Sequence, residues 1–388
     1  MAPYEHGRLT RNTKYSLPPN QCFDTALKAL TKNIPISTQG KCNARALLST
    51  FIGMAVGKQS CHSIQKQVSN VPSETSIRHH LRKFNIDQLE EVNHTILVDF
   101  LEEMIPKERG YEFSIDLTDD PYYGSITPEN EDYIVKGPTK KSTKTFYRYA
   151  TLYMTHRQIK ITLAVLPVKK GTKHIEYVKR FIELIEEMGL KIKVLLLDRG
   201  FFSVSMIRYL MGMNIPHIMP VKNVSNEMMR ILAVKKVRFE PYTVTSPKDG
   251  SVDVTVAIDV HYLKGKFKRH GAVTYGYVVY GIDWNPRKIY RTYRRRFAIE
   301  SSYRMRNKVR PRTSSKNPTF RYLLAIISFL LKNVWMLFKW KFFARMKRGP
   351  KVIEDDHFRF DRFILSMVLV FHRRAKAIVD IRTIRPCR

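Results

Sequence analysis

Cysteine is rare in this 388-residue sequence, and acidic residues are half as numerous as basic ones. The four cysteines are Cys22, Cys42, Cys61 and Cys387, and no two of them form a Cys-x-x-Cys pair. This spacing gives a zinc site little support, and reduced, mostly buried thiols of a cytosolic protein account for all four. Residues 1–14 are polar and basic without an apolar segment, so we expect no signal peptide.

A hydrophobic run long enough to cross a membrane is also missing. The most apolar stretch, residues 322–338, is a little short for a membrane span and has Lys332 at its centre. We therefore expect a helix buried inside the protein, no association with a membrane, and a cytoplasmic location.

Positive charge is what the sequence has in excess. It holds 68 Lys and Arg against 34 Asp and Glu, a net charge of +34, and its isoelectric point is near 10.0. A surplus spread along the chain indicates a polyanionic partner, with nucleic acid first and an anionic membrane surface second. Mixed charges would serve solubility alone with less self-repulsion. The length allows about two or three domains, and an apolar content of 44% is ordinary for a globular protein.

Residues 1–108 are predicted to form a helical N-terminal DNA-binding region. A polar break at residues 69–72 precedes Ser73, a good N-cap for the basic helix that follows. A helix, a short turn and a basic helix are typical of a helix-turn-helix, which places its second helix in a DNA groove. The side chains offered to the groove would be Arg78, His79, Arg82 and Lys83. A plain helical bundle with a solvated basic face explains the same pattern equally well.

Residues 109–221 change from helical spacing to strand-like alternation. The predicted strands are residues 112–118, 146–155, 158–168, 193–198 and 215–221. Helices are predicted at residues 173–188 and 204–211, and a loop at residues 119–138. Three strands, a helix, a strand, a helix and a strand follow the order of an RNase H-like mixed sheet, so the expected fold class is α/β.

Three further regions complete the chain. Residues 222–283 are rich in β-forming residues and turn signals, and they are predicted to be an all-β insertion. Residues 284–345 are basic and helical from about Phe297, then apolar and helical, and are predicted to complete the core. Residues 346–388 hold a second apolar run and are predicted to end as a basic helical tail.

Two aspartates stand at the ends of apolar strands. Asp116 and Asp198 each follow a run of buried-type residues, and a carboxylate at the mouth of a buried strand needs a partner such as a divalent metal ion. Taken singly, each is more often a turn or cap residue. Together with the sheet order and Glu300, they indicate a site for two Mg²⁺ ions suited to phosphoryl transfer. Asp119 and Asp120 are alternatives in the same loop and rank below Asp116.

A dense run of arginines surrounds Glu300. Arg296 and Glu300 stand four positions apart, so on a helix they share one face, and a plain ion pair is the simplest account of the two. An ion pair does not explain the other arginines nearby, which are Arg291, Arg294, Arg295, Arg304, Arg306, Arg310 and Arg312. Phosphate contacts do explain them. Arg296 can clamp a phosphate in a bidentate manner, and Tyr293 can donate to a phosphate oxygen.

Three segments carry a resemblance to a known family, namely residues 115–124, 197–202 and 293–300. They look like the insertion-sequence DDE transposases. More narrowly, they resemble the cut-and-paste group similar to insertion sequence family four, which is marked by Tyr-x2-Arg-x3-Glu-x6-Lys. Tyr293, Arg296 and Glu300 match that spacing.

The lysine of that motif has no counterpart at the expected position, which is Asn307. Lys308, Arg304 and Arg306 are the candidates to replace it. The resemblance spans roughly residues 111–335. The separation of Asp198 from the motif glutamate (300 − 198 = 102 residues) is similar to that of group members with a β-strand insertion.

The resemblance implies an RNase H-like core in which Asp116, Asp198 and Glu300 bind two Mg²⁺ or Mn²⁺ ions. Such transposases hydrolyse one DNA strand at the terminal inverted repeats of the transposable element, and the freed 3′-hydroxyl attacks the other strand or the target DNA. The resemblance also implies a homodimer on DNA, associated with the nucleoid of a prokaryotic cell. Relatives with a hairpin intermediate stack a flipped base on an aromatic side chain. Trp284 is a candidate for that role, and a place in the core explains it as well.

Two other functions fit the same residues. The first is a metal-dependent DNA nuclease or integrase without transposition. The second is a non-catalytic DNA-binding protein descended from a transposase. Cleavage of the element ends that depends on Mg²⁺ separates these alternatives from one another.

Overall fold

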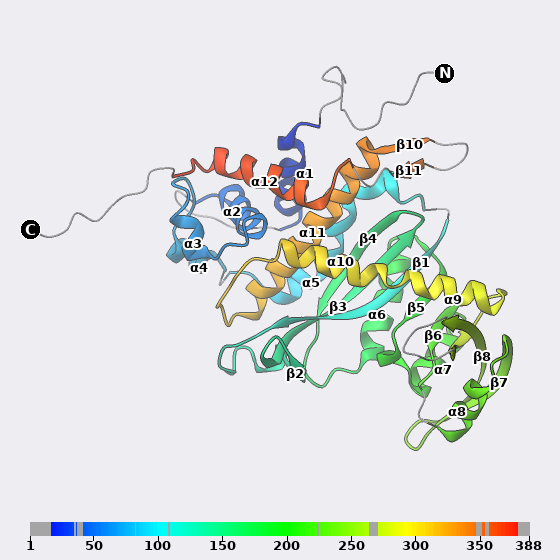
Figure 1. The fold of residues 1–388 in the computed structure, drawn as a ribbon. Helices are drawn as coiled ribbons and strands as arrows, with labels where there is room; N and C mark the ends of the chain where they lie inside the picture. The colour runs from blue at the N-terminus through cyan, green and yellow to red at the C-terminus, as the bar shows by residue number, and fades with distance from the viewer. Residues whose placement is uncertain are drawn as a thin grey trace, which may run out of the picture.

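The computed structural model describes residues 17–34, 36, 42–81, 83–107, 109–222, 225–263, 271–346, 351–353 and 357–378. Figure 1 shows a large twisted sheet with a group of helices from both ends of the chain packed against it. The described part is therefore a mixed α/β protein, as the sequence predicts.

One mixed sheet organises the molecule. Its strand order is β2-β3-β1-β5-β6-β9-β8-β7, and β4 pairs with β3 on a side path. The strands of its first half are β1 (Gly110–Pro121), β3 (Thr143–His156), β4 (Ile159–Pro167), β5 (Lys191–Leu197) and β6 (His217–Pro220). Strand β1 is antiparallel to β3 and parallel to β5, and β5 is parallel to β6. The positions of all five predicted strands are thereby confirmed.

Helices α6 (His174–Glu187) and α7 (Val204–Gly212) connect these strands as crossovers. Helix α6 turns an apolar stripe that includes Phe181 and Ile185 to the interior. Helix α7 begins at the predicted cap, where the Ser203 hydroxyl accepts a hydrogen bond from the Met206 N–H at 3.2 Å. Parallel strands need such crossovers, so these helices place β5 beside β1 and β6 beside β5.

The stretch 222–283 differs from the predicted all-β insertion in two ways. It contains a helix, α8 (Asn226–Ala233), in addition to β7 (Arg238–Ser246), β8 (Gly250–Leu263) and β9 (Gly271–Tyr280). Strand β9 pairs antiparallel with β6, so these strands prolong the central sheet and do not form a separate one. Pairing between strands far apart in sequence leaves no local signal, which is why the sequence did not reveal it.

The loop predicted at residues 119–138 is also partly structured. Strand β1 continues to Pro121, and β2 (Ile134–Lys140) pairs with β3 at the edge of the sheet. The aspartates at positions 119 and 120 therefore lie on a strand and not in a loop.

The N-terminal region is helical, as predicted. It consists of α1 (Pro19–Asn33), α2 (Ala44–Val56), α3 (Cys61–Gln65), α4 (Glu74–Leu81), α5 (Ile86–Val98) and the 3-10 helix η1 (Asp99–Met104). Helix α4 buries Ile77, His80 and Leu81, and it exposes Arg78. Lys83 is also exposed, and Arg82 lies outside the described residues. The helix preceding α4 has a single turn, so insertion of α4 into a DNA groove stays a prediction.

The predicted buried helix is confirmed as α11 (Pro318–Phe342). It is the one described helix long and apolar enough to cross a membrane, and 94% of its apolar window is buried inside the protein. Lys332 lies fully buried on it, donates to the Lys160 carbonyl, and stands 5.0 Å from the centre of the Tyr153 ring. Burial lowers the pKa of Lys332 well below its ordinary value. Helix α11 is therefore the central core helix between the sheet and the N-terminal helices (Figure 1).

The last region, residues 346–388, begins within the two-stranded ribbon of β10 (Ala344–Met346) and β11 (Lys351–Ile353) and continues into α12 (Phe360–Arg374). Helix α12 packs on α1 and α2, and Arg374 bonds to Asp24 at 2.7 and 3.0 Å. The basic residues after position 378 lie outside the described residues. The described tail is thus part of the helical layer.

A buried carboxyl in this layer gives a pH-dependent prediction. Burial raises the pKa of Glu90 on α5 to about 7, and its Oε1 has no hydrogen-bond partner among the described residues. A carboxyl whose pKa is raised on folding costs stability as the pH rises from the unfolded pKa, about 4.3, through the folded one. Glu90→Gln is expected to increase the free energy of unfolding at pH 8 by about 1–2 kcal/mol, allowing for solvent screening. Urea unfolding at pH 5 and pH 8 measures this.

The matched control is Glu91→Gln, because Glu91 is the exposed neighbour on the same helix. It is expected to leave both values within about 0.5 kcal/mol of the parent. A gain for Glu90→Gln that is equal at the two pH values would contradict the role of its ionisation.

Candidate active site

The pairing of two neighbouring parallel strands brings the predicted aspartates together. The predicted place at a strand end is right for Asp198 and wrong for Asp116, which lies within β1. Ile115 on β1 is opposite Leu197 on β5 in the parallel register, and Asp116 and Asp198 are the next residues of the two strands. Strand β5 ends there, whereas β1 continues to Pro121. The Asp116 side chain is therefore enclosed, with 15% of its surface exposed, and the Asp198 side chain is 44% exposed.

Arg296 joins the two carboxylates. Its Nη1 lies 3.2 Å from Asp116 Oδ2, and its Nη2 lies 3.4 Å from Asp198 Oδ1. The side chain is only 6% exposed, and its buried Nε has no hydrogen-bond partner among the described residues. The predicted ion pair with Glu300 is absent from the described part of the chain. Arg296 instead serves as the counter-ion of the two aspartates.

A break in the helix explains why Arg296 turns away from Glu300. Helix α9 (Pro286–Arg295) ends just before Arg296, and α10 (Ala298–Lys308) begins two residues later. Arg296 thus caps one helix, and Glu300 lies exposed in the first turn of the next. The two therefore do not share one face of a single helix, and the predicted start of a helix at about Phe297 is confirmed.

The charge of Glu300 still acts on Asp116. The pKa of Asp116 is raised to about 6, with burial as the largest cause. The charges of Asp198 and Glu300 also act to raise it, and Arg296 and the Leu117 N–H act to lower it. One arginine therefore leaves the negative charge of this site incompletely balanced. A carboxylate in this situation gains from a second cation.

The donor chemistry fits a divalent metal ion, because the charges of two further carboxylates act on Asp116 and Mg²⁺ prefers oxygen ligands. In the arrangement of the described residues, however, no group of three or more His, Cys, Asp or Glu is placed to hold a metal ion. The guanidinium of Arg296 bridges Asp116 and Asp198 instead.

Tyr293 helps to hold Arg296 beside the two aspartates. Its hydroxyl donates to the Leu197 carbonyl at 3.3 Å, and its ring lies 4.9 Å from the Tyr277 ring. Burial raises the pKa of Tyr293 to about 12. Arg296 lies over the same ring at 5.4 Å. The predicted phosphate donor is therefore a buried residue that positions Arg296.

A cavity of about 310 Å³ opens beside Asp198. Its lining includes the aromatic and basic side chains of Arg199, Tyr275, Tyr277, Tyr293, Arg294, Arg296 and Phe297. Aromatic faces and arginines together suit the bases and phosphates of a nucleic acid. Sequence reasoning missed Tyr275 and Tyr277, because they lie on β9 and only the pairing of β9 with β6 brings them here.

The three candidates for the motif lysine differ in their exposure to solvent. Arg306 is fully buried and binds Asp120 through two hydrogen bonds of 2.6 and 2.7 Å. Its prediction as a DNA-binding residue is therefore wrong for this conformation, because no part of the side chain reaches solvent. Arg304 is exposed, and Lys308 reaches solvent while bound to Asp361 at 2.8 Å. These two remain the candidates.

The neighbouring aspartates, Asp119 and Asp120, form ion pairs within the protein. Asp119 is bound by Arg148 at 2.6 Å and by Lys140 at 3.0 Å. Asp120 is bound by Arg306 and, at 2.8 Å, by Arg310. Both are already paired with arginine, so neither replaces Asp116 at the candidate site.

Trp284 lies just before α9 and is half-buried. Lys288 stands 4.4 Å and Lys193 5.6 Å from the centre of its ring, and the ring packs on a small apolar cluster around Ile289. Both the core role and the base-stacking role of Trp284 fit this position.

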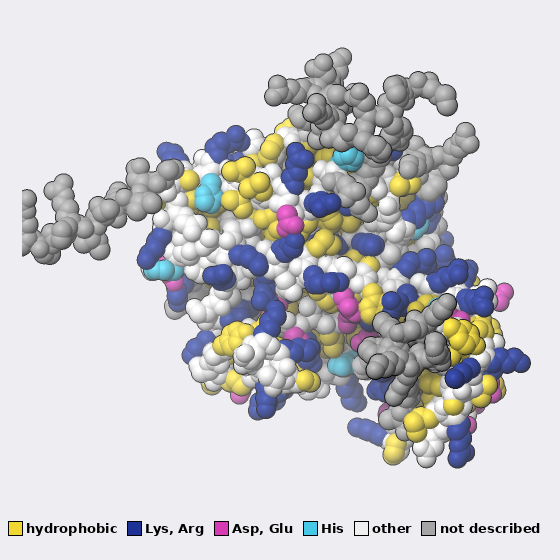
Figure 2. Space-filling model, in the orientation of Figure 1, with side chains coloured by type: hydrophobic (Ala, Val, Ile, Leu, Met, Phe, Trp, Pro, Cys, Tyr) yellow, Lys and Arg dark blue, Asp and Glu magenta, His cyan; other side chains and the backbone are white. Residues whose placement is uncertain are grey.

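Positive charge is widespread around this region. Figure 2 shows Lys and Arg side chains distributed over the visible face, with few acidic side chains among them. Exposed arginines near the site, such as Arg294 and Arg295, belong to this distribution. The site is thus an anionic spot within a basic surface.

No protein-family model matches the sequence, and no curated protein sequence matches it. Among solved structures, the chain is similar to the piggyBac transposase in a synaptic complex with hairpin DNA, determined by cryo-EM. The TM-score is 0.53 at 13% sequence identity, over 95% of this chain and 83% of that one. At this identity the likeness concerns the fold, which is thus of a kind found in a DNA transposase.

Proposed function

We propose that this protein is a DNA transposase of the DDE type, which cuts DNA at the terminal inverted repeats of its element and transfers the 3′-hydroxyl end into target DNA. The observation that carries the proposal is the convergence of Asp116 and Asp198 on neighbouring parallel strands, bridged by Arg296, within a fold like that of a known transposase. The strand order β4-β3-β1-β5-β6 supports an RNase H-like core.

Asp116, Asp198 and Glu300 would hold two Mg²⁺ or Mn²⁺ ions. When bound, such ions activate the water or 3′-hydroxyl nucleophile and stabilise the leaving oxygen of a phosphodiester. The protein's own residues prepare the site: Arg296 binds both aspartates and holds them close together, and Tyr293 holds Arg296 in position.

DNA would approach from the solvent side. Asp198 is the more exposed aspartate, and the adjoining cavity presents Arg199 and Arg294 to a phosphodiester. These arginines bind and orient the backbone near the carboxylates. Two copies of the chain acting on paired element ends complete the proposal.

A cleavage assay tests this function. The full chain is incubated with a supercoiled plasmid carrying its own gene and the DNA that flanks it, with Mg²⁺, with Mn²⁺, or with EDTA. We expect breaks at the element ends and joined products with either ion, and removal of the ion by EDTA to abolish both. Breaks without joined products would indicate a nuclease. Tight binding without breaks would indicate a non-catalytic DNA-binding protein.

A further inference from the structure

The segment between α10 and α11, residues 310–317, is an extended connector without helix or strand. Two cavities of about 540 and 480 Å³ adjoin it, and both are lined by Arg312, Thr313 and Ser314. The connector thus forms the shared wall of two hollows at the junction of the N-terminal helices and the sheet. The candidate active site does not use either of them.

The 540 Å³ cavity is basic. Its charged lining residues are Lys58, Asp120, Arg310, Arg312 and Arg321. The single acid among them, Asp120, is already bound by Arg306 and Arg310. Lys58 and Arg312 are exposed, and neither has an acidic partner in the part of the chain that the structure describes. The cavity therefore presents uncompensated positive charge.

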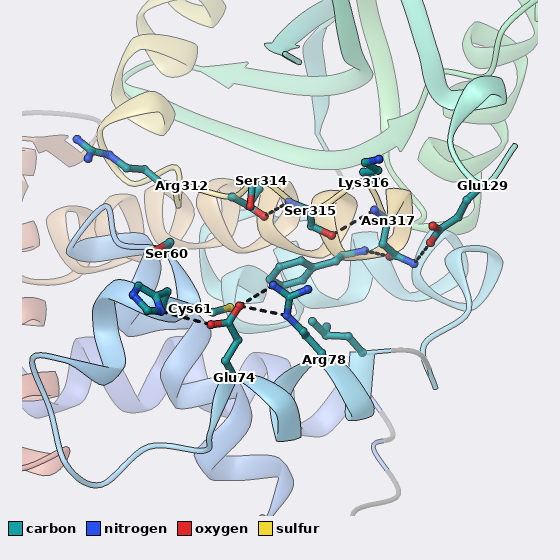
Figure 3. A pocket seen from close by; sticks show the side chains of 14 residues that line it. Ser60, Cys61, Glu74, Arg78, Glu129, Arg312, Ser314, Ser315, Lys316 and Asn317 are labelled. Carbon is teal, nitrogen blue, oxygen red and sulfur yellow. Dashed lines mark hydrogen bonds and ion pairs between the residues drawn. The ribbon is translucent and has the colours of Figure 1, made fainter. Parts of the chain in front are cut away.

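The lining of the 480 Å³ cavity also includes hydroxyl groups. Figure 3 shows Ser314, Ser315 and Lys316 along the connector, with Glu74 and Arg78 facing them from α4. Glu74 is bound by Arg78 at 2.6 Å. The other acid of this cavity, Glu129, accepts from Asn317 Nδ2 at 2.9 Å. Its acids are thus engaged, and serine and threonine hydroxyls suit phosphate oxygens.

The connector is held in place by the protein. Arg321 on α11 donates to the carbonyls of Ser315 at 2.5 Å and Thr313 at 3.2 Å, and it stacks on the Tyr122 ring at 4.9 Å. The Arg312 N–H donates to the Gln59 carbonyl at 3.2 Å, which ties the connector to the loop that carries Lys58. The two free cations are therefore presented by a fixed backbone, which reduces the ordering cost of binding.

The 540 Å³ cavity shares two elements with the candidate active site, β1 and α10. Asp116 and Asp120 are four residues apart on β1, a distance of about 13 Å along a strand. Glu300 and Asn307, which lines the 540 Å³ cavity, are seven residues apart on α10, about 10 Å along a helix. At about 3.4 Å per nucleotide in duplex DNA, this separation equals about three to four nucleotides.

We infer that the connector groove, formed by Lys58, residues 310–316 and Arg321, binds the phosphodiester backbone of DNA that leads away from the active site. This inference rests on the proposed function. Within the N-terminal region, the residue inferred to contact DNA is Lys58, in the loop after α2. The fixed, unpaired cations and flanking hydroxyls match the groups that commonly contact a phosphate backbone.

The test compares the full chain with the double variant Lys58→Ala/Arg312→Ala. The probe is a 30-base-pair duplex of mixed sequence, bound without divalent ions at several salt concentrations. We expect the double variant to bind about 10- to 100-fold more weakly, and the slope of log affinity against log salt to fall by about two. The matched control is Lys28→Ala/Lys191→Ala, which removes two exposed lysines from α1 and from the far end of β5.

The possible outcomes distinguish failure of the inferred groove from failure of the proposed function. Unchanged affinity and slope in the double variant overturn the groove and leave the function standing. Loss of affinity for poly-glutamate but not for DNA also overturns it, in favour of an acidic protein segment. Failure of the parent protein to bind DNA overturns the function and the groove with it. Cleavage by the double variant is expected to return to the parent rate at saturating protein concentration, because the groove binds DNA without touching the cleaved bond.

Discussion

Asp198→Asn is expected to lower the rate of Mg²⁺-dependent DNA cleavage by about 10³-fold or more. The substitution keeps the size of the side chain and removes the charge that a metal ligand needs. Metal ions supply several kcal/mol of charge stabilisation in phosphoryl transfer, and each 1.36 kcal/mol is a factor of ten in rate. The measurement is the single-turnover rate of strand cleavage on DNA that carries the element ends, with parent and variant at equal, saturating concentrations.

The design separates loss of chemistry from loss of folding. The Asp198 side chain is 44% exposed and follows the last residue of β5, so its replacement leaves the core intact. Asp253→Asn is the matched control, since Asp253 is exposed on β8 of the same sheet. We expect the control to cleave at the parent rate. Cleavage by Asp198→Asn within about threefold of the parent rate would remove Asp198 from the active site and with it the DDE assignment.

Glu300→Gln tests the third carboxylate in the same assay. Glu300 is exposed at the start of α10, and its charge contributes to the raised pKa of Asp116. We expect a loss of cleavage comparable with that of Asp198→Asn, together with unchanged thermal unfolding. The two variants together distinguish a three-carboxylate site from a pair of aspartates neutralised by Arg296.

Local signals in the sequence predicted much of the fold. The alternation around Asp116 predicted β1, and the Ser203 cap predicted the start of α7, because these patterns depend on a few neighbouring residues. The placement of Lys332 within an apolar run predicted a buried helix, which α11 confirms. The convergence of the two aspartates was predicted from the order of the strands together with Glu300, and the parallel pairing of β1 with β5 brings them together.

The features of the fold and the site that could not be predicted from the sequence depend on contacts between distant segments of the chain. Nothing near Tyr277 indicates that β9 pairs with β6 and carries that ring to the candidate site. A run of arginines looks uniformly basic in sequence, yet Arg296 pairs with two aspartates, Arg306 is buried, and Arg304 is exposed. The tertiary structure determines which of these arginines is buried in the core, which pairs with the aspartates and which is exposed on the surface.

Arg306→Met is expected to lower the free energy of unfolding by about 3 kcal/mol or more. Arg306 is fully buried and forms two short hydrogen bonds to Asp120 and one to the Ser328 hydroxyl at 2.8 Å. Burial alone would raise the pKa of Asp120, and Arg306 together with Arg310 holds that pKa at about 2. Removing Arg306 leaves a buried carboxylate with one partner, and breaking such a pair typically costs about 3–5 kcal/mol.

Urea unfolding at pH 7 measures this effect, with Arg304→Met as the matched control, since Arg304 is two residues away on α10 and exposed. The control is expected to change stability by less than about 0.5 kcal/mol. In Arg306→Met/Asp120→Asn no buried charge is left unpaired, so much of the lost stability should return. If Arg306→Met instead weakened DNA binding with no change in unfolding, its guanidinium would contact the DNA, and the buried ion pair would be wrong.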